Sequence, residues 1–320
     1  MENVKNKISA PQLFCLVFCY VLAGLRLHGA KSIAATLFVC LFCVCVCVVC
    51  AAVCENFGSF SALSCAVMGK AGFVFRASGV LLLALPLIAT LYEMARGAAN
   101  FYENGASAVF LPVLILLLVF ASAKGFCTLG RFGELCVFPL AFLLPLSLLG
   151  GGGHGVSLAF GQEDVAACFA AFGGAPVFFS LYLRCAGQSE QSEFAAASSF
   201  SPEPVACGVS AVLAAGLVHI FLLFTGAGSV LSSFLFWFIA LGRLFAFSLS
   251  VGDVLSLPES GRADAAKRLA AFAAACTAVW ILSARFAAVC GAALAVLNVV
   301  FPCAVFAVCF LRQSYGKMRV

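Results

Sequence analysis

The sequence predicts an all-α, polytopic membrane protein with ten transmembrane helices. Of its 320 residues, 64% are hydrophobic and only 10% are charged, which is too apolar for a water-soluble domain of this size. A helix needs about 20 mostly apolar residues to cross the hydrocarbon core, and stretches of that length recur along the whole chain. Lys and Arg gather in alternate connecting segments, as expected when successive helices cross a membrane in opposite directions.

The apolar stretches define the elements in order along the chain. The predicted spans lie near residues 9–27, 33–54, 75–97, 106–123, 134–150, 165–184, 205–224, 228–250, 266–284 and 288–311. The segments between them are short, so they leave no room for a soluble catalytic domain. We expect a single integral-membrane domain over residues 1–320.

The basic residues predict the orientation. With the N-terminus in the cytoplasm, the inner segments hold 13 of the 18 Lys and Arg residues, namely Lys5, Lys7, Lys70, Arg76, Lys124, Arg131, Arg184, Arg262, Lys267, Arg268, Arg312, Lys317 and Arg319. Because basic segments stay cytoplasmic, both termini are expected inside. The net charge of +5 is explained by this asymmetry and by contact with membrane lipids, so it requires no nucleic-acid partner.

Two spans carry residues that interrupt a helix, and they occupy matching positions in the two halves of the chain. Residues 1–152 and 153–320 would each contribute five spans to an inverted repeat. The first span contains Gly24 and Gly29, and the sixth contains Gly173-Gly174-Ala175-Pro176. Paired broken helices mark the solute site in transporters built from inverted repeats, because unwound backbone leaves amides and carbonyls free for a ligand. The alternative is that these glycines serve close helix packing.

Ionisable residues within the spans are further candidates, since charges are costly in hydrocarbon. Glu93, beside Tyr92 in the third span, either meets a ligand amine or pairs with Arg96 on the same helix face. Arg243 lies near enough to the inner end of the eighth span to snorkel. Asn298 in the tenth span can cross-link helices. No Ser/His/Asp, Cys/His or paired-carboxylate set converges, so we expect no catalytic residues, no enzyme activity and no cofactor.

The 18 cysteines are concentrated in the second span. Cys40, Cys43, Cys47, Cys50 and Cys54 share one helix face and Cys45 lies off it. Thiolates bind zinc, but charging several of them inside hydrocarbon is costly. We therefore expect these residues to pack as small, polarizable side chains and expect no metal site.

One junction resembles a known family. Between the fourth and fifth spans the chain contains Lys124-Gly125, then Arg131, Glu134 and Pro139. This pattern is similar to that of the spore germination permeases, the B-type subunits of nutrient germinant receptors. The start of the chain, Ile8-Ser9-Ala10-Pro11-Gln12-Leu13-Phe14, and the segment Ser250-Val251-Gly252-Asp253-Val254-Leu255 also resemble the family.

The resemblance implies a leucine-transporter-like fold of the amino acid–polyamine–organocation superfamily, located in the spore inner membrane or the cytoplasmic membrane of a spore former. It implies a small nutrient ligand, often an amino acid, and partnership with an A-type subunit and a lipoprotein C-type subunit. The residues expected around the ligand, between spans 1, 3, 6 and 8, are Gly24, Gly29, Tyr92, Glu93, Gly173, Gly174 and Ala175. Lys124, Arg131 and Glu134 are expected to be structural or gating residues, because Glu134 follows Arg131 by three positions and can pair with it.

Two other functions are compatible with the sequence. A secondary amino-acid transporter coupled to H⁺ or Na⁺ would take up solute without partner subunits. A structural subunit of a membrane complex would bind no ligand, and substitutions at Gly173 and Glu93 would change only the stability of that complex.

Overall fold

The computed structural model describes residues 8–27, 32–54, 57, 59–101, 113, 116–117, 125–147, 168, 171–172, 174–186, 202–225, 230–255, 297–298 and 300–311. These residues are almost entirely helical. The elements are α1 (Ala10–Leu27), α2 (Ile33–Cys54), α3 (Phe60–Met68), the 3₁₀ turn η2 (Gly69–Ala71), α4 (Gly72–Phe101), α6 (Phe126–Ser147), α8 (Ala175–Ala186), α9 (Pro202–Thr225) and α10 (Val230–Val254). A further apolar helix spans Val300–Leu311.

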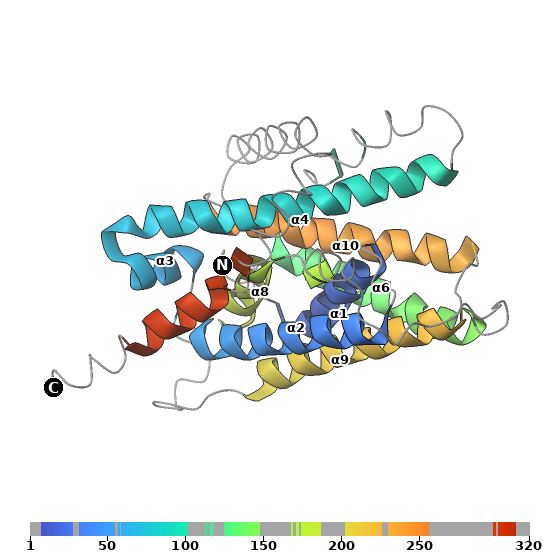
Figure 1. Cartoon of the computed structure of the whole chain (residues 1–320), viewed down its shortest axis with the longest axis horizontal. Helices are drawn as coiled ribbons and strands as arrows, with labels where there is room; N and C mark the ends of the chain where they lie inside the picture. Colours follow the sequence, from blue (N-terminus) through green and yellow to red (C-terminus); the bar gives the residue numbers. More distant parts are fainter. Residues whose placement is uncertain are drawn as a thin grey trace.

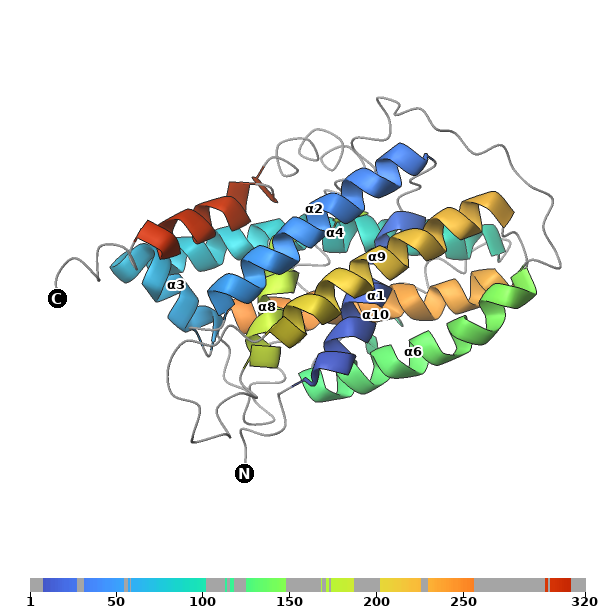
Figure 2. The same ribbon diagram turned by 90° about the horizontal axis from the view of Figure 1, so that it is seen from below.

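Helix α1 lies at the centre of the bundle and packs against α9, α10 and α6 (Figures 1 and 2). Every residue from Leu16 to Leu25 is buried. A helix that is apolar around its whole circumference belongs in a core, because no face of it gains from contact with water or lipid. Helices α2 and α9 pair on one side of α1, while α10 packs against both α4 and α6.

Large apolar side chains cover the outer faces of the bundle. Leu41 on α2, Leu217 on α9 and Leu135 on α6 are each at least 66% exposed. Four segments within the described residues are long and apolar enough to cross a membrane, namely Ala10–Leu27, Ile33–Cys54, Phe60–Leu83 and Glu203–Phe224. An apolar exterior around a helical bundle is the surface that a lipid bilayer requires.

The structure confirms several predicted elements and corrects others. Helices α1, α2 and α9 occupy the predicted first, second and seventh spans. The segment before the third span, expected to be a connection, instead forms α3 and η2, which fold back along the start of α4 (Figure 1). Ser59 caps α3 by accepting a hydrogen bond from the Ala62 N–H, and Gly69 ends it with a φ of 59°. The spans near 106–123 and 266–284 lie mostly or wholly outside the described residues.

The fifth predicted span begins at Phe126 rather than near 134, because the glycine-containing junction is helical and packs closely against α1. Gly125 has a φ of 83°, a left-handed conformation that favours glycine, and it sets the start of α6. Gly130 faces the Gln12 side chain and Gly133 faces Leu16. Their missing side chains let α6 approach α1 closely.

The start of α1 has a capping box. The Gln12 N–H donates to Ser9 Oγ (3.4 Å), and the Ser9 N–H donates to Gln12 Oε1 (3.1 Å). This reciprocal arrangement satisfies two amides at a helix N-terminus. Because Gln12 also contacts Gly130, the segment that begins the chain and the segment around Arg131 are packed together.

The cysteine face of α2 is where the sequence placed it. Cys40, Cys43, Cys47, Cys50 and Cys54 are buried and Cys45 is exposed. The buried thiols point toward α8 and α9: Cys40 Sγ donates to the Val212 carbonyl (3.8 Å) and Cys54 Sγ to the Phe179 carbonyl (3.7 Å). Within the described part of the chain, no group of three or more His, Cys, Asp or Glu residues is placed to hold a metal ion.

Candidate functional site

The sixth predicted span is interrupted. Ala171 and Phe172 are helical, Gly174 is not, and α8 begins at Ala175. The Gly174 N–H turns back to the Phe172 carbonyl (3.1 Å) instead of continuing the helical pattern. The predicted break is therefore present at Gly174, directly before the first residue of α8, while Gly173 lies outside the described residues.

Two side chains from distant helices bind the backbone groups that the break separates. In an uninterrupted helix the Ala175 N–H would donate to the Ala171 carbonyl. Here the Ala175 N–H donates to Asn298 Oδ1 (3.3 Å), and the Ala171 carbonyl accepts from Arg243 Nη1 (2.8 Å). One end of the break thus has an amide cap and the other a cationic cap, so the interruption is a built feature of the fold.

Arg243 does not snorkel to the bundle end as predicted. Its side chain is fully buried, and its Nη1 also donates to the Tyr20 carbonyl of α1 (3.4 Å). The guanidinium lies over the Tyr20 ring, 4.8 Å from its centroid, and over the Phe247 ring at 5.6 Å. Carbonyl oxygens and ring faces together offset part of the cost of burying this charge.

Gly24 contributes space and not an unwound segment. Helix α1 is continuous through Leu27, so Gly24 does not interrupt it and the close-packing alternative holds at this position; Gly29 lies outside the described residues. A Cβ built on Gly24 would overlap both Arg243 Nη1 and the Ala171 carbonyl oxygen. The absence of a side chain here lets the Arg243 guanidinium and the broken span lie directly against α1.

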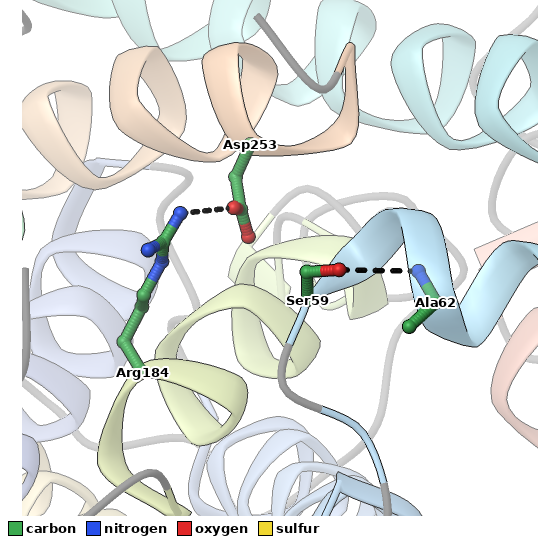
Figure 3. Close-up of polar contacts among 4 residues, drawn as sticks. All are labelled: Ser59, Ala62, Arg184 and Asp253. Atoms are coloured by element: carbon green, nitrogen blue, oxygen red, sulfur yellow. Dashed lines mark hydrogen bonds and ion pairs between the residues drawn. The ribbon is translucent and has the colours of Figure 1, made fainter. Parts of the chain in front are cut away.

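A second polar cluster lies at the end of the bundle where α1 begins and α8 and α10 end. Arg184 Nη2 on α8 forms an ion pair with Asp253 Oδ1 on α10 at 2.5 Å, as Figure 3 shows. The two side chains are only 20% and 5% exposed. The Arg184 carbonyl accepts from the Ile8 N–H (3.3 Å), and its guanidinium lies 5.3 Å from the Phe126 ring centroid.

This cluster brings together the three segments that carry the family resemblance, since Ile8, Phe126 and Asp253 each contact Arg184. The basic-residue pattern predicted Arg184 as an inner cation, but no local pattern in the sequence pairs it with Asp253. One signal was available: the sixth and eighth spans both end on the predicted cytoplasmic side, so their terminal charges face the same membrane surface.

Of the residues predicted to be structural or gating, the structure describes Arg131 and Glu134, and neither is brought to either site. Arg131 and Glu134 are both exposed on α6, and within the described residues no ion pair joins them. An exposed pair three residues apart gains little from contact, because solvent screens its charges and ordering two long side chains costs entropy. Lys124 lies outside the described residues, as do the side chains of Tyr92 and Glu93, whose backbones belong to α4.

The helical bundle, its apolar exterior and the interrupted helix together define a helical integral membrane protein. Inside this bundle, one helix is broken, and the backbone groups at the break are capped by side chains. Neither the known protein families nor the curated proteins compared with this chain give a match.

The Asn298 contact has a measurable consequence. Substituting Asn298→Ala leaves the buried Ala175 N–H without its acceptor, which should lower the free energy of unfolding by about 1–3 kcal/mol. Denaturant unfolding of the purified protein in detergent checks the effect. Asn298→Asp retains an oxygen acceptor at a helix N-terminus and should recover most of the loss. Equal stability of the alanine and aspartate variants would contradict the capping role.

Proposed function

We propose that this protein is a permease-like membrane protein that binds a small amphoteric solute, such as an amino acid, at the break in its sixth span. The observation that carries the proposal is the replacement of one helical hydrogen bond by Asn298 and Arg243. Broken helices held at the middle of a bundle are the recurrent solute sites of transporters. Gly24 on α1 and Leu82 on α4 border the break, since a Cβ on Gly174 would lie 3.3 Å from the Leu82 carbonyl.

The proposal includes the arrangement expected from the sequence: ten spans in a 5+5 inverted repeat, with both termini in the cytoplasm. The positions of the basic residues support it, as does the break at the start of the second half.

We further propose that the protein acts as the B-type subunit of a spore nutrient germinant receptor, with an A-type subunit and a lipoprotein C-type subunit as partners. Support comes from the three segments that resemble that family and from their meeting around Arg184. Ligand binding at the break would shift an equilibrium between two packings of the bundle, which the partner subunits would read.

Spore germination tests this function. Gly174→Ala adds a methyl group at the break, 3.3 Å from the Leu82 carbonyl oxygen and 3.7 Å from Asn298 Oδ1. Spores expressing the variant with its partner subunits should lose their response to one nutrient of an amino-acid and sugar panel, with the complex still present in the membrane. Gly252→Ala is the matched control, because nothing lies within 4 Å of a Cβ at that position.

Three results would overturn the proposal. An unchanged nutrient profile for Gly174→Ala would remove the break as the solute site. Uptake of solute by this chain alone in vesicles would instead identify a secondary transporter. A fall in the amount of complex, with a normal response to every nutrient per assembled complex, would identify a structural subunit.

A further inference from the structure

Arg243 occupies a position with the chemistry of a cation site. Its Nη1 contacts two backbone carbonyl oxygens, those of Ala171 at the end of a half-helix and of Tyr20 on α1. In transporters with broken helices, half-helix C-terminal ends and unwound carbonyls coordinate the coupling ion. The partial negative charge at a helix C-terminus attracts a cation whether that cation is free or covalently attached.

The surroundings fit a permanently resident cation. Arg243 is fully buried, so its guanidinium is not in contact with solvent. Two aromatic rings, Tyr20 and Phe247, lie against the guanidinium, and Gly24 leaves the volume that it fills. Of the cationic side chains, arginine holds its proton most firmly, so a guanidinium is the side chain best suited to supply a fixed positive charge at this position.

We propose that Arg243 is a tethered cation, which takes the place of a free Na⁺ at the helix break and makes solute binding there independent of sodium. The claim that solute binding is independent of sodium rests on the proposed function. The claim that Arg243 fills the cation position does not. Sodium coupling is therefore not expected for this chain, because the Arg243 guanidinium already fills the position where the carbonyl oxygens would hold the ion.

The cation position can be tested without any nutrient. The purified protein in lipid nanodiscs is heated in NaCl, KCl or N-methylglucamine chloride at equal ionic strength. The natural protein should give the same Tm in all three salts. Arg243→Ala leaves the Ala171 and Tyr20 carbonyl oxygens accessible to Na⁺. Without Na⁺, the Tm of this variant should be lower than that of the natural protein. It should rise with the logarithm of the Na⁺ concentration, as linkage requires for an ion that binds only the folded state.

Three further variants sharpen the test. Arg243→Lys retains a cation and should stay insensitive to Na⁺. Arg243→Gln removes the charge but keeps a polar side chain, and it serves as the uncharged variant if Arg243→Ala fails to fold. Arg131→Gln makes the same charge change on the exposed face of α6 and should leave both Tm and salt response unchanged.

Two outcomes would overturn the inference: a sodium-specific rise in the Tm of the natural protein, or folded Arg243→Ala and Arg243→Gln variants that behave identically in Na⁺ and K⁺. Germination assays then address the dependent claim. Spores with the natural chain should respond equally in Na⁺ and K⁺ buffers, and those with Arg243→Gln should require Na⁺. A protein that meets the Tm predictions but gives no nutrient response would contradict the proposed function and leave the tethered cation intact.

Discussion

Gly24→Ala is expected to be among the most damaging additions of a single methyl group to this protein. The new Cβ would overlap Arg243 Nη1 and the Ala171 carbonyl oxygen, and would lie 2.9 Å from the Ala171 carbonyl carbon. Two of these three atoms belong to backbone, so no side-chain rotation relieves the contact. Overpacking of a core costs roughly 1–3 kcal/mol and sometimes more, and here we expect about 3 kcal/mol or failure to fold.

Equilibrium unfolding in detergent, together with the yield of folded protein, measures the effect. Gly252→Ala on α10 again provides the control: its Cβ meets open space, and alanine is the better helix former by up to about 1 kcal/mol. The control should therefore be as stable as the natural protein or slightly more so. A Gly24→Ala variant with the stability of this control would show that Arg243 and the broken span do not lie against α1.

The second large effect is expected at the ion pair between α8 and α10. Asp253→Ala leaves the mostly buried Arg184 without this carboxylate, and removal of one partner from a buried pair costs about 3–5 kcal/mol. Because the Arg184 backbone also binds Ile8, the loss should loosen the start of α1 as well as the ends of α8 and α10. Unfolding free energy and hydrogen exchange of the α1 amides provide the measurements.

The double variant Arg184→Met/Asp253→Leu removes both charges and should be more stable than Asp253→Ala alone, because no single charge is left buried. Glu134→Ala is the control, since that carboxylate is exposed on α6 and its loss should change stability by no more than about 0.5 kcal/mol. A double variant no better than the single one would show that the pair does not couple these helices.

Much of the architecture could be predicted because it depends on local sequence. The apolar lengths of α1, α2 and α9 set their boundaries, since the requirement to span hydrocarbon acts on each segment separately. The buried face of α2 followed from helical periodicity applied to five cysteines. The break at Gly174 followed from a Gly-Gly-Ala-Pro run, whose residues resist a continuous helix wherever they occur.

The positions that the sequence left open or predicted wrongly are those where a local pattern allows several outcomes. A glycine such as Gly24 can unwind a helix or permit close packing, and only the position of Arg243 decided for packing. The segment before α4 is apolar enough to form α3, but the helix depends on the Ser59 cap and on packing against α4. Helical spacing made an Arg131–Glu134 pair possible, yet their exposure removes the gain from forming it.

The sequence by itself determined that this chain is a helical membrane protein, where several of its spans lie and which span is interrupted. Only the tertiary structure decided the partner of each buried charge. Arg243 donates to the Ala171 carbonyl 72 positions away, and Arg184 pairs with Asp253 69 positions away. The physical reason is that hydrophobic length and backbone conformation are properties of a segment. The partner of a buried charge, by contrast, depends on how helices distant in sequence are rotated against one another, and that rotation is set by packing across the whole bundle.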